Sequence, residues 1–113
     1  MTPVEVLLQW FDAHRRGDLD AARAVLVEDA PIVLPDRTLV GFDALMRFFG
    51  ERREQRPEFS YSVADVLAGD GHAAALLDMR EGDRRWRQLA LYTVREDRII
   101  AIWAAEDDRP VGT

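Results

Sequence analysis

The sequence predicts an α+β fold, with helices in the first half of the chain and antiparallel strands in the second. Apolar residues recur at helical spacing up to about residue 53, and from Phe59 onward they alternate between short turns. At Gly17-Asp18, a glycine that can end one helix precedes an aspartate that can cap the next. The 113 residues are therefore expected to form one domain, 1–113.

The first two helices are predicted from their ends. Thr2-Pro3-Val4-Glu5 reads as a capping box with proline in the first helical position, so the first helix should start there and stop at Gly17. Its predicted apolar stripe is Val4, Leu7, Leu8 and Phe11, flanked by Trp10 and His14. The second helix should run from Leu19 to Val27 and bury Ala22, Val25 and Leu26.

A short strand pair and a third helix follow. Residues 30–34 should form a strand that Pro35-Asp36 stops, and residues 38–40 its return. The third helix is predicted over residues 42–53. It should carry Leu45, Met46, Phe48 and Phe49 inward. The charged run 51–56 is expected to be a solvated helix end without a binding role.

The second half should consist of consecutive antiparallel hairpins. The predicted strands are 59–67, 72–80, 84–95 and 98–105, and their turns are Gly69-Asp70-Gly71, Gly82-Asp83 and Glu96-Asp97. The tail, residues 106–113, is acidic and then contains proline and glycine, so it should fray.

Composition excludes several classes of function. There are no cysteines, and His14 and His72 lie far apart, so we expect no metal site. A net charge of −6 disfavours nucleic acid as a partner. No apolar run approaches the length of a membrane span or a signal peptide, so no membrane association and a cytoplasmic location are expected. Without a glycine-rich phosphate loop or dinucleotide fingerprint, no cofactor is expected.

Four segments together carry a family resemblance: Gly17-Asp18, Glu28-Asp29-Ala30, Gly41-Phe42-Asp43-Ala44-Leu45 and Asp97-Arg98-Ile99-Ile100. In this order and spacing the chain resembles the SnoaL-like branch of the nuclear transport factor 2-like superfamily. The resemblance implies a cone-shaped fold in which three N-terminal helices pack in the concave face of a curved, mainly antiparallel sheet. The superfamily contains isomerases, cyclases, hydrolases and proteins without catalysis, so the fold alone does not assign a reaction.

Two relatives allow a comparison by position. The three catalytic positions of ketosteroid isomerase fall on Trp10, Leu34 and about Ala90, none of which carries the expected tyrosine or carboxyl group. Limonene-epoxide hydrolase would place its first aspartate near Asp78, its arginine at Leu76 and its second aspartate near Ala105. Asp78 and Arg80 could restore that pairing in reverse order, as an inference from spacing.

Strand alternation then predicts a mostly apolar pocket. Taking Ala90 as inward-facing, the strands would contribute Trp86, Gln88, Tyr92, Val94, Ala74, Leu76, Asp78, Arg80, Ile102, Ala104 and Glu106. Trp10 and His14 would join from the first helix, and Leu34 and Phe49 complete the predicted substrate-binding set. Trp10, Phe49, Trp86 and Tyr92 could stack on a ring system.

Asp78 and His14 are the predicted catalytic residues. Asp78 lies in an apolar run, where a carboxylate must be paired, protonated or near water, so a structural ion pair with Arg80 or Arg87 is the alternative. His14 could act as a base near neutral pH, or could instead interact with the end of its helix or with Asp18.

The favoured function is a cofactor-free enzyme that acts by acid/base chemistry on a small hydrophobic, polycyclic, terpenoid or polyketide molecule, as a cyclase, isomerase or epoxide hydrolase. A non-catalytic ligand-binding or dimerisation module is the main alternative, and a protein-docking adaptor is a third. The predicted outer sheet face is apolar, so we expect a homodimer through that face. The residues predicted there are Leu77, Met79, Leu89, Leu91 and Trp103.

Overall fold

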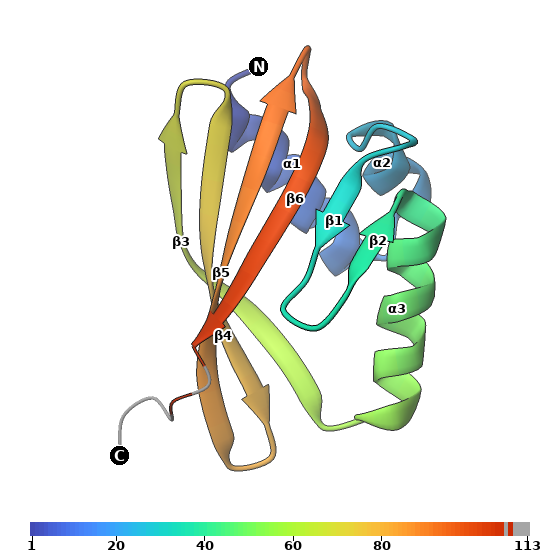
Figure 1. The fold of residues 1–113 in the computed structure, drawn as a ribbon, viewed down its shortest axis with the longest axis vertical. Helices are drawn as coiled ribbons and strands as arrows, with labels where there is room; N and C mark the ends of the chain where they lie inside the picture. Colours follow the sequence, from blue (N-terminus) through green and yellow to red (C-terminus); the bar gives the residue numbers. More distant parts are fainter. Residues whose placement is uncertain (108, 110–113) are drawn as a thin grey trace.

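The helices and strands follow the predicted order. The structure is a computed structural model that describes residues 1–107 and 109 (Figure 1). Its elements are α1 (Pro3–Arg16), α2 (Leu19–Ala24), β1 (Pro31–Val33), β2 (Thr38–Val40), α3 (Phe42–Gln55), β3 (Phe59–Gly69), β4 (His72–Glu81), β5 (Arg84–Arg95) and β6 (Arg98–Asp107). The expectation that the tail frays from residue 106 is wrong for Glu106 and Asp107, which belong to β6, and residues 108 and 110–113 of that tail lie outside the described residues.

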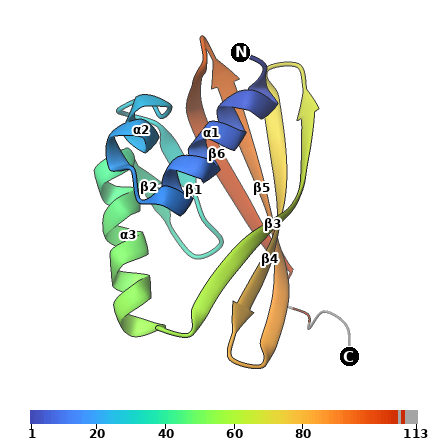
Figure 2. The ribbon, with the colours of Figure 1, turned by 180° about the vertical axis from the view of Figure 1, so that it is seen from behind.

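The strands form one mixed sheet in the order β2-β1-β6-β5-β4-β3. Only the β1–β6 pair is parallel, and the other pairs are antiparallel. Helix α1 crosses one face of the four long strands (Figure 2), and α3 stands beside the short β1–β2 pair. The predicted α+β architecture, with three helices and a curved, mainly antiparallel sheet, is confirmed.

The predicted start of α1 and the predicted junction between α1 and α2 are confirmed by their hydrogen bonds. The Thr2 hydroxyl accepts from the Glu5 backbone N–H at 3.2 Å, and the Glu5 carboxylate accepts from the Thr2 N–H at 3.2 Å. Gly17 takes the left-handed conformation with φ +68°, and the Asp18 carboxylate caps α2 by accepting from the Ala21 N–H at 3.1 Å. These contacts fix the junction between α1 and α2.

Helix α2 ends at Ala24, three residues before the predicted end at Val27. The reason is that the following residues pair with the last hairpin. The Ile99 N–H donates to the Val25 carbonyl at 2.7 Å, and the Val27 N–H donates to the Ile99 carbonyl at 2.9 Å. Ala22, Val25 and Leu26 are nevertheless buried, as predicted.

The buried stripe of α1 differs from the prediction. Its buried residues are Val6, Leu7, Trp10 and Ala13. Leu8 is 52% exposed, because it lies two residues from the buried Trp10, a rotation of about 200° that places it on nearly the opposite side of the helix.

The predicted inward face of β4 is wrong. The two-residue turn Gly82-Asp83 pairs Met79 with Trp86, Leu77 with Gln88, and Ala75 with Ala90. Directly opposed residues share a face of a sheet. The inward residues of β4 are therefore Ala73, Ala75, Leu77 and Met79, and the outward ones are Ala74, Leu76, Asp78 and Arg80. Leu77 and Met79 accordingly do not belong to the outer face, whereas Leu89, Leu91 and Trp103 are exposed there.

None of the helices in the described part of the chain is both long and apolar enough to cross a membrane.

Gly41 is the position where the fold most needs a glycine. It has φ +86°, and a Cβ built on it would lie 2.6 Å from the Glu28 carbonyl oxygen. Gly41→Ala is expected to lower the free energy of unfolding by about 2 kcal/mol or more, through backbone strain and this clash. Gly50→Ala is the matched control. It lies inside α3, where a Cβ would meet the Arg53 side chain at an ordinary contact distance of 3.8 Å, so the substitution should raise stability by about 0.5–1 kcal/mol. Urea unfolding of both variants checks this, and equal effects would contradict it.

Candidate functional site

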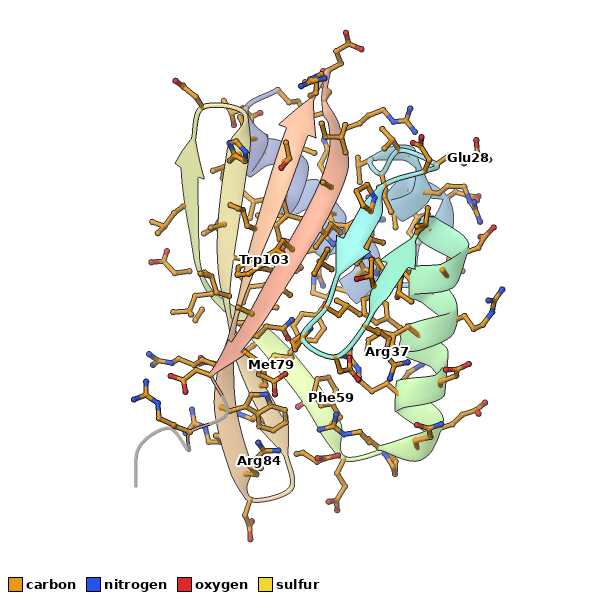
Figure 3. All side chains as sticks on the ribbon, viewed as in Figure 1. Glu28, Arg37, Phe59, Met79, Arg84 and Trp103 are labelled. Carbon is orange, nitrogen blue, oxygen red and sulfur yellow. The ribbon has the colours of Figure 1, made fainter. Side chains whose placement is uncertain are left out.

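A cavity of about 330 Å³ lies between the inner face of the sheet, α1, α3 and the β1–β2 connection. Figure 3 shows Phe59 of β3 and Met79 of β4 near Arg37 of that connection, in the space between the sheet and α3. The cavity forms because α1 packs against β3, β4, β5 and β6, while α3 contacts the short strand β2. A volume near the lower end of the ~300–1,000 Å³ range for small-molecule sites fits a compact ligand.

Most of the residues predicted for the site line this cavity. They are Trp10, His14, Leu34, Phe49, Trp86, Gln88, Ala90, Tyr92 and Ile102. Ala104 and Glu106, also predicted to face inward, line it as well. The structure brings these residues together, and their roles in binding or catalysis stay predictions.

Leu76, Asp78 and Arg80 do not line the cavity, because they lie on the outward face of β4. The Asp78 carboxylate is 28% exposed, and its Oδ1 lies 3.5 Å from Nε of Arg87 on the neighbouring strand. This contact with Arg87 is one of the two structural ion pairs that the sequence offered as the alternative to a catalytic role for Asp78. The expectation that Asp78 and Arg80 share a pocket with His14 is therefore wrong, and we leave Asp78 out of the proposal below.

Several lining residues were missed. The charged end of α3, expected to be only solvated, contributes Glu51, Arg52, Gln55 and Arg56, and β3 contributes Phe59 and Tyr61. A signal for the arginines was present in the sequence. Leu45, Phe49, Arg52 and Arg56 follow one another at three- and four-residue spacing, so they share one face of the helix.

His14 is packed between aromatic rings instead of bonding the helix end. Its ring centroid lies 4.1 Å from that of Trp10 and 5.8 Å from that of Phe49, both edge to face. Burial lowers the pKa of His14 from 6.5 to about 4. Nε2 is buried and has no hydrogen-bond partner in the part of the chain that the structure describes. The imidazole is therefore neutral at pH 7 and available as a proton acceptor.

Two tyrosines supply protonated hydroxyls to the cavity wall. Burial raises the pKa of Tyr92, which is 4% exposed, and its interactions with Tyr61 and Trp10 act in opposite directions on it. Burial also raises the pKa of Tyr61, while the positive charge of Arg52 opposes that shift. Both groups remain hydrogen-bond donors at neutral pH.

Three arginines stand at the cavity, and two of them are paired. Arg37 Nη2 lies 3.0 Å from Asp36, and Arg56 binds both carboxylate oxygens of Glu81 at 2.8 Å. The Arg56 guanidinium lowers the pKa of Glu81. The third, Arg52, packs on aromatic rings, and burial lowers its pKa to about 10.

This arrangement could bind a small molecule that is apolar along most of its length and polar at one or two points. A neutral imidazole can accept a proton, and the tyrosine and arginine donors could stabilise an oxygen that becomes negative. No three metal-ligating side chains gather anywhere in residues 1–107 and 109.

The model of the SnoaL-like domain matches residues 7–102, so the chain belongs to the SnoaL-like family. A search of curated proteins finds no match. The structure is similar to a candidate ketosteroid isomerase from Kribbella flavida, with 19% identity, a TM-score of 0.77 and coverage of 96% of this chain and 80% of that one.

Two further solved structures share this fold. IdmH, a candidate polyketide cyclase from Streptomyces antibioticus, has 19% identity, a TM-score of 0.76 and coverage of 95% and 93%. A protein of unknown function from Xanthomonas campestris has 16% identity, a TM-score of 0.80 and coverage of 96% and 93%. At these identities the likeness shows the fold alone.

The positions where the resemblance places the groups of ketosteroid isomerase all face the cavity. Trp10, Leu34 and Ala90 are lining residues. None of them can act as a general base, because none has a titratable group that accepts a proton. Any acid/base chemistry in this cavity must therefore use other lining side chains, and His14 is a half-buried candidate base among them.

His14 should make stability depend on pH. Between pH about 6.5 and about 4 the unfolded chain binds a proton at His14 that the folded protein does not bind. The free energy of unfolding therefore falls as pH drops through this window, by up to about 3 kcal/mol from this residue. His14→Phe removes the titrating group. As the pH is lowered from 7 to 4, the free energy of unfolding of His14→Phe, measured by urea unfolding, should therefore rise relative to that of the wild type.

The exposed residue His72 provides the control, because His72→Gln should keep the pH dependence of the wild type. A stability difference between wild type and His14→Phe that stays constant from pH 7 to pH 4 would contradict the burial-induced shift.

Proposed function

We propose that this protein binds a small, mostly apolar ketone or enol in the cavity and moves a proton on it, with His14 as the base. The observation that carries the proposal is the neutral imidazole in the cavity wall, with a buried nitrogen that has no partner among the described residues. A single-chain cavity with apolar walls and few polar groups is the usual form of such a site.

The low basicity of His14 sets a condition on the reaction. A base with a pKa of about 4 is unprotonated at pH 7, but it accepts a proton only from a carbon acid that the site itself makes more acidic. In a water-poor site, hydrogen bonds that stabilise the developing oxyanion make the neighbouring C–H group more acidic. Tyr61 and Gln88 are lining residues with hydrogen-bond donors for this role.

The names of similar structures guide the choice of ligand. A candidate ketosteroid isomerase and a candidate polyketide cyclase share this fold. A fused-ring ketone is therefore the first class to test. Trp10, Phe49 and Trp86 provide ring faces for such a molecule in the cavity.

Binding and proton transfer can be tested separately. Of the three tryptophans, Trp10 and Trp86 line the cavity and Trp103 does not. In a Trp103→Phe protein, the tryptophan fluorescence therefore comes only from the two residues of the cavity. The neutral dye N-phenyl-1-naphthylamine should bind and accept energy from them. Exchange of the α-protons of 2-tetralone for deuterium, followed by NMR, measures proton transfer.

His14→Phe should lower the exchange rate about 100-fold or more and leave dye binding within a few-fold of the parent protein. Phenylalanine keeps the ring and its packing while removing the base. If the parent protein binds the dye but both proteins exchange 2-tetralone at the same rate, the chain is a ligand-binding module and the catalytic proposal is wrong.

We also propose that a second copy of the chain covers the outer face of the sheet. Leu67 is 64% exposed, Leu89 45%, Leu91 38% and Trp103 47%, and they occupy neighbouring positions on β3, β5 and β6. A contiguous apolar face of this kind is uncommon on a monomer. A symmetric pairing would bury the same patch on both copies.

Sedimentation should give about twice the chain mass of 12.9 kDa. Trp103→Arg should shift the mass toward one chain, because a buried guanidinium without a partner is unfavourable in an interface. Leu8→Lys is the control, since Leu8 is equally exposed but lies on α1. A wild-type mass of one chain would contradict the dimer.

A further inference from the structure

Arg52 is the cavity-lining arginine that lacks a carboxylate partner. Arg37 is paired with Asp36, and Arg56 is held by Glu81. Within residues 1–107 and 109, the Arg52 guanidinium makes neither an ion pair within 4.0 Å nor a side-chain hydrogen bond. The site therefore contains one cation whose charge no neighbouring acid balances directly.

The surroundings of Arg52 are aromatic. Its guanidinium carbon lies 4.0 Å from the ring centroid of Phe59, 5.1 Å from that of Phe49 and 5.4 Å from that of Phe48. Ring faces attract the cation, but they offer no oxygen acceptors to its five N–H donors. Burial disfavours the charge, which is why the pKa of Arg52 is lowered to about 10. An anion in the cavity would satisfy both the charge and the donors.

The other charged groups at the cavity limit the charge of that anion. Asp36, Glu51 and Glu106 also line it, and two of the three arginines are already paired. A group with two negative charges, such as a phosphate, would meet these acids, while the described lining residues offer it only one unpaired cation. A single carboxylate matches the planar fork of one guanidinium.

The aromatic ring of Phe49 connects Arg52 with His14. Phe49 lies edge to face with the imidazole, and the guanidinium stands over the same ring. A molecule held by Arg52 at one end would extend along the apolar wall toward His14. Trp10 and Trp86 also line this cavity.

We propose that Arg52 binds a carboxylate of the ligand, so that the ligand class of this cavity is an aromatic or polycyclic monocarboxylic acid. This inference rests on the proposed function, because it assigns the substrate class of the same cavity. Arg52 is then a specificity-determining residue, and the carboxylate end of the ligand sets how its apolar part lies against His14.

The test compares two ligands of the same shape. In the Trp103→Phe protein, 2-naphthoate and its neutral amide, 2-naphthamide, are titrated by tryptophan fluorescence and by calorimetry. The parent protein should bind 2-naphthoate at least about tenfold more tightly, as expected for a charge-assisted hydrogen-bonded pair in a partly buried site. Arg52→Gln should remove that preference by weakening 2-naphthoate binding while leaving 2-naphthamide within about twofold.

Arg53→Gln is the matched control, because it makes the same change of charge at an exposed neighbouring position. It should keep the preference for the carboxylate. Equal loss of 2-naphthoate affinity in both variants would show a general charge effect and overturn the inference.

The outcomes distinguish this inference from the proposed function. If the neutral dye and 2-naphthamide bind but 2-naphthoate shows no advantage, the carboxylate inference is wrong and the apolar binding site stands. If neither the dye nor either naphthalene ligand binds, the proposed function is wrong and the inference fails with it.

Discussion

The alternation of side chains along β4 and β5 is the constraint on which the rest of the site depends. The two-residue turn at Gly82-Asp83 fixes the register, and with it the side of the sheet on which each residue lies. It places Leu77 opposite Gln88 and Met79 opposite Trp86 on the concave face. A shift of one residue would have put Asp78 into the cavity and exposed Met79, giving a different site on the same backbone.

The fold could be predicted from local signals, because each helix end has its own chemistry in the sequence. The capping box at Thr2, the left-handed Gly17 and the cap at Asp18 all form as expected. The site was predicted only in part. Taking Ala90 as inward-facing led to Ala74, Leu76, Asp78 and Arg80 on β4, although the two-residue turn Gly82-Asp83 pairs Ala90 with Ala75 and so already contained the correct register. The composition of the charged run 51–56 could not show that Arg52 differs from its solvated neighbours, because only the packing of α3 determines which arginine turns inward.

Burial lowers the pKa of two polar groups of the cavity, with different consequences for their charge at neutral pH. Among aromatic rings, His14 loses its tendency to take a proton and becomes a neutral acceptor. Arg52, in similar surroundings, keeps a charge at neutral pH because its ordinary pKa is so high. One apolar wall thus presents an uncharged acceptor at one place and an unbalanced cation at another. A symmetric apolar ligand would use neither, so the wall favours a molecule with two unlike ends.

The ion pair between Arg56 and Glu81 joins the residue that follows α3 to the end of β4, and Arg56 also lines the cavity. Both side chains remain partly exposed, at 40% and 29%. An ion pair in such surroundings contributes about 0–1 kcal/mol, so it breaks and re-forms readily and weakens further in salt. The contact between the end of α3 and β4 should therefore loosen as the ionic strength rises, while the apolar walls of the cavity stay in place.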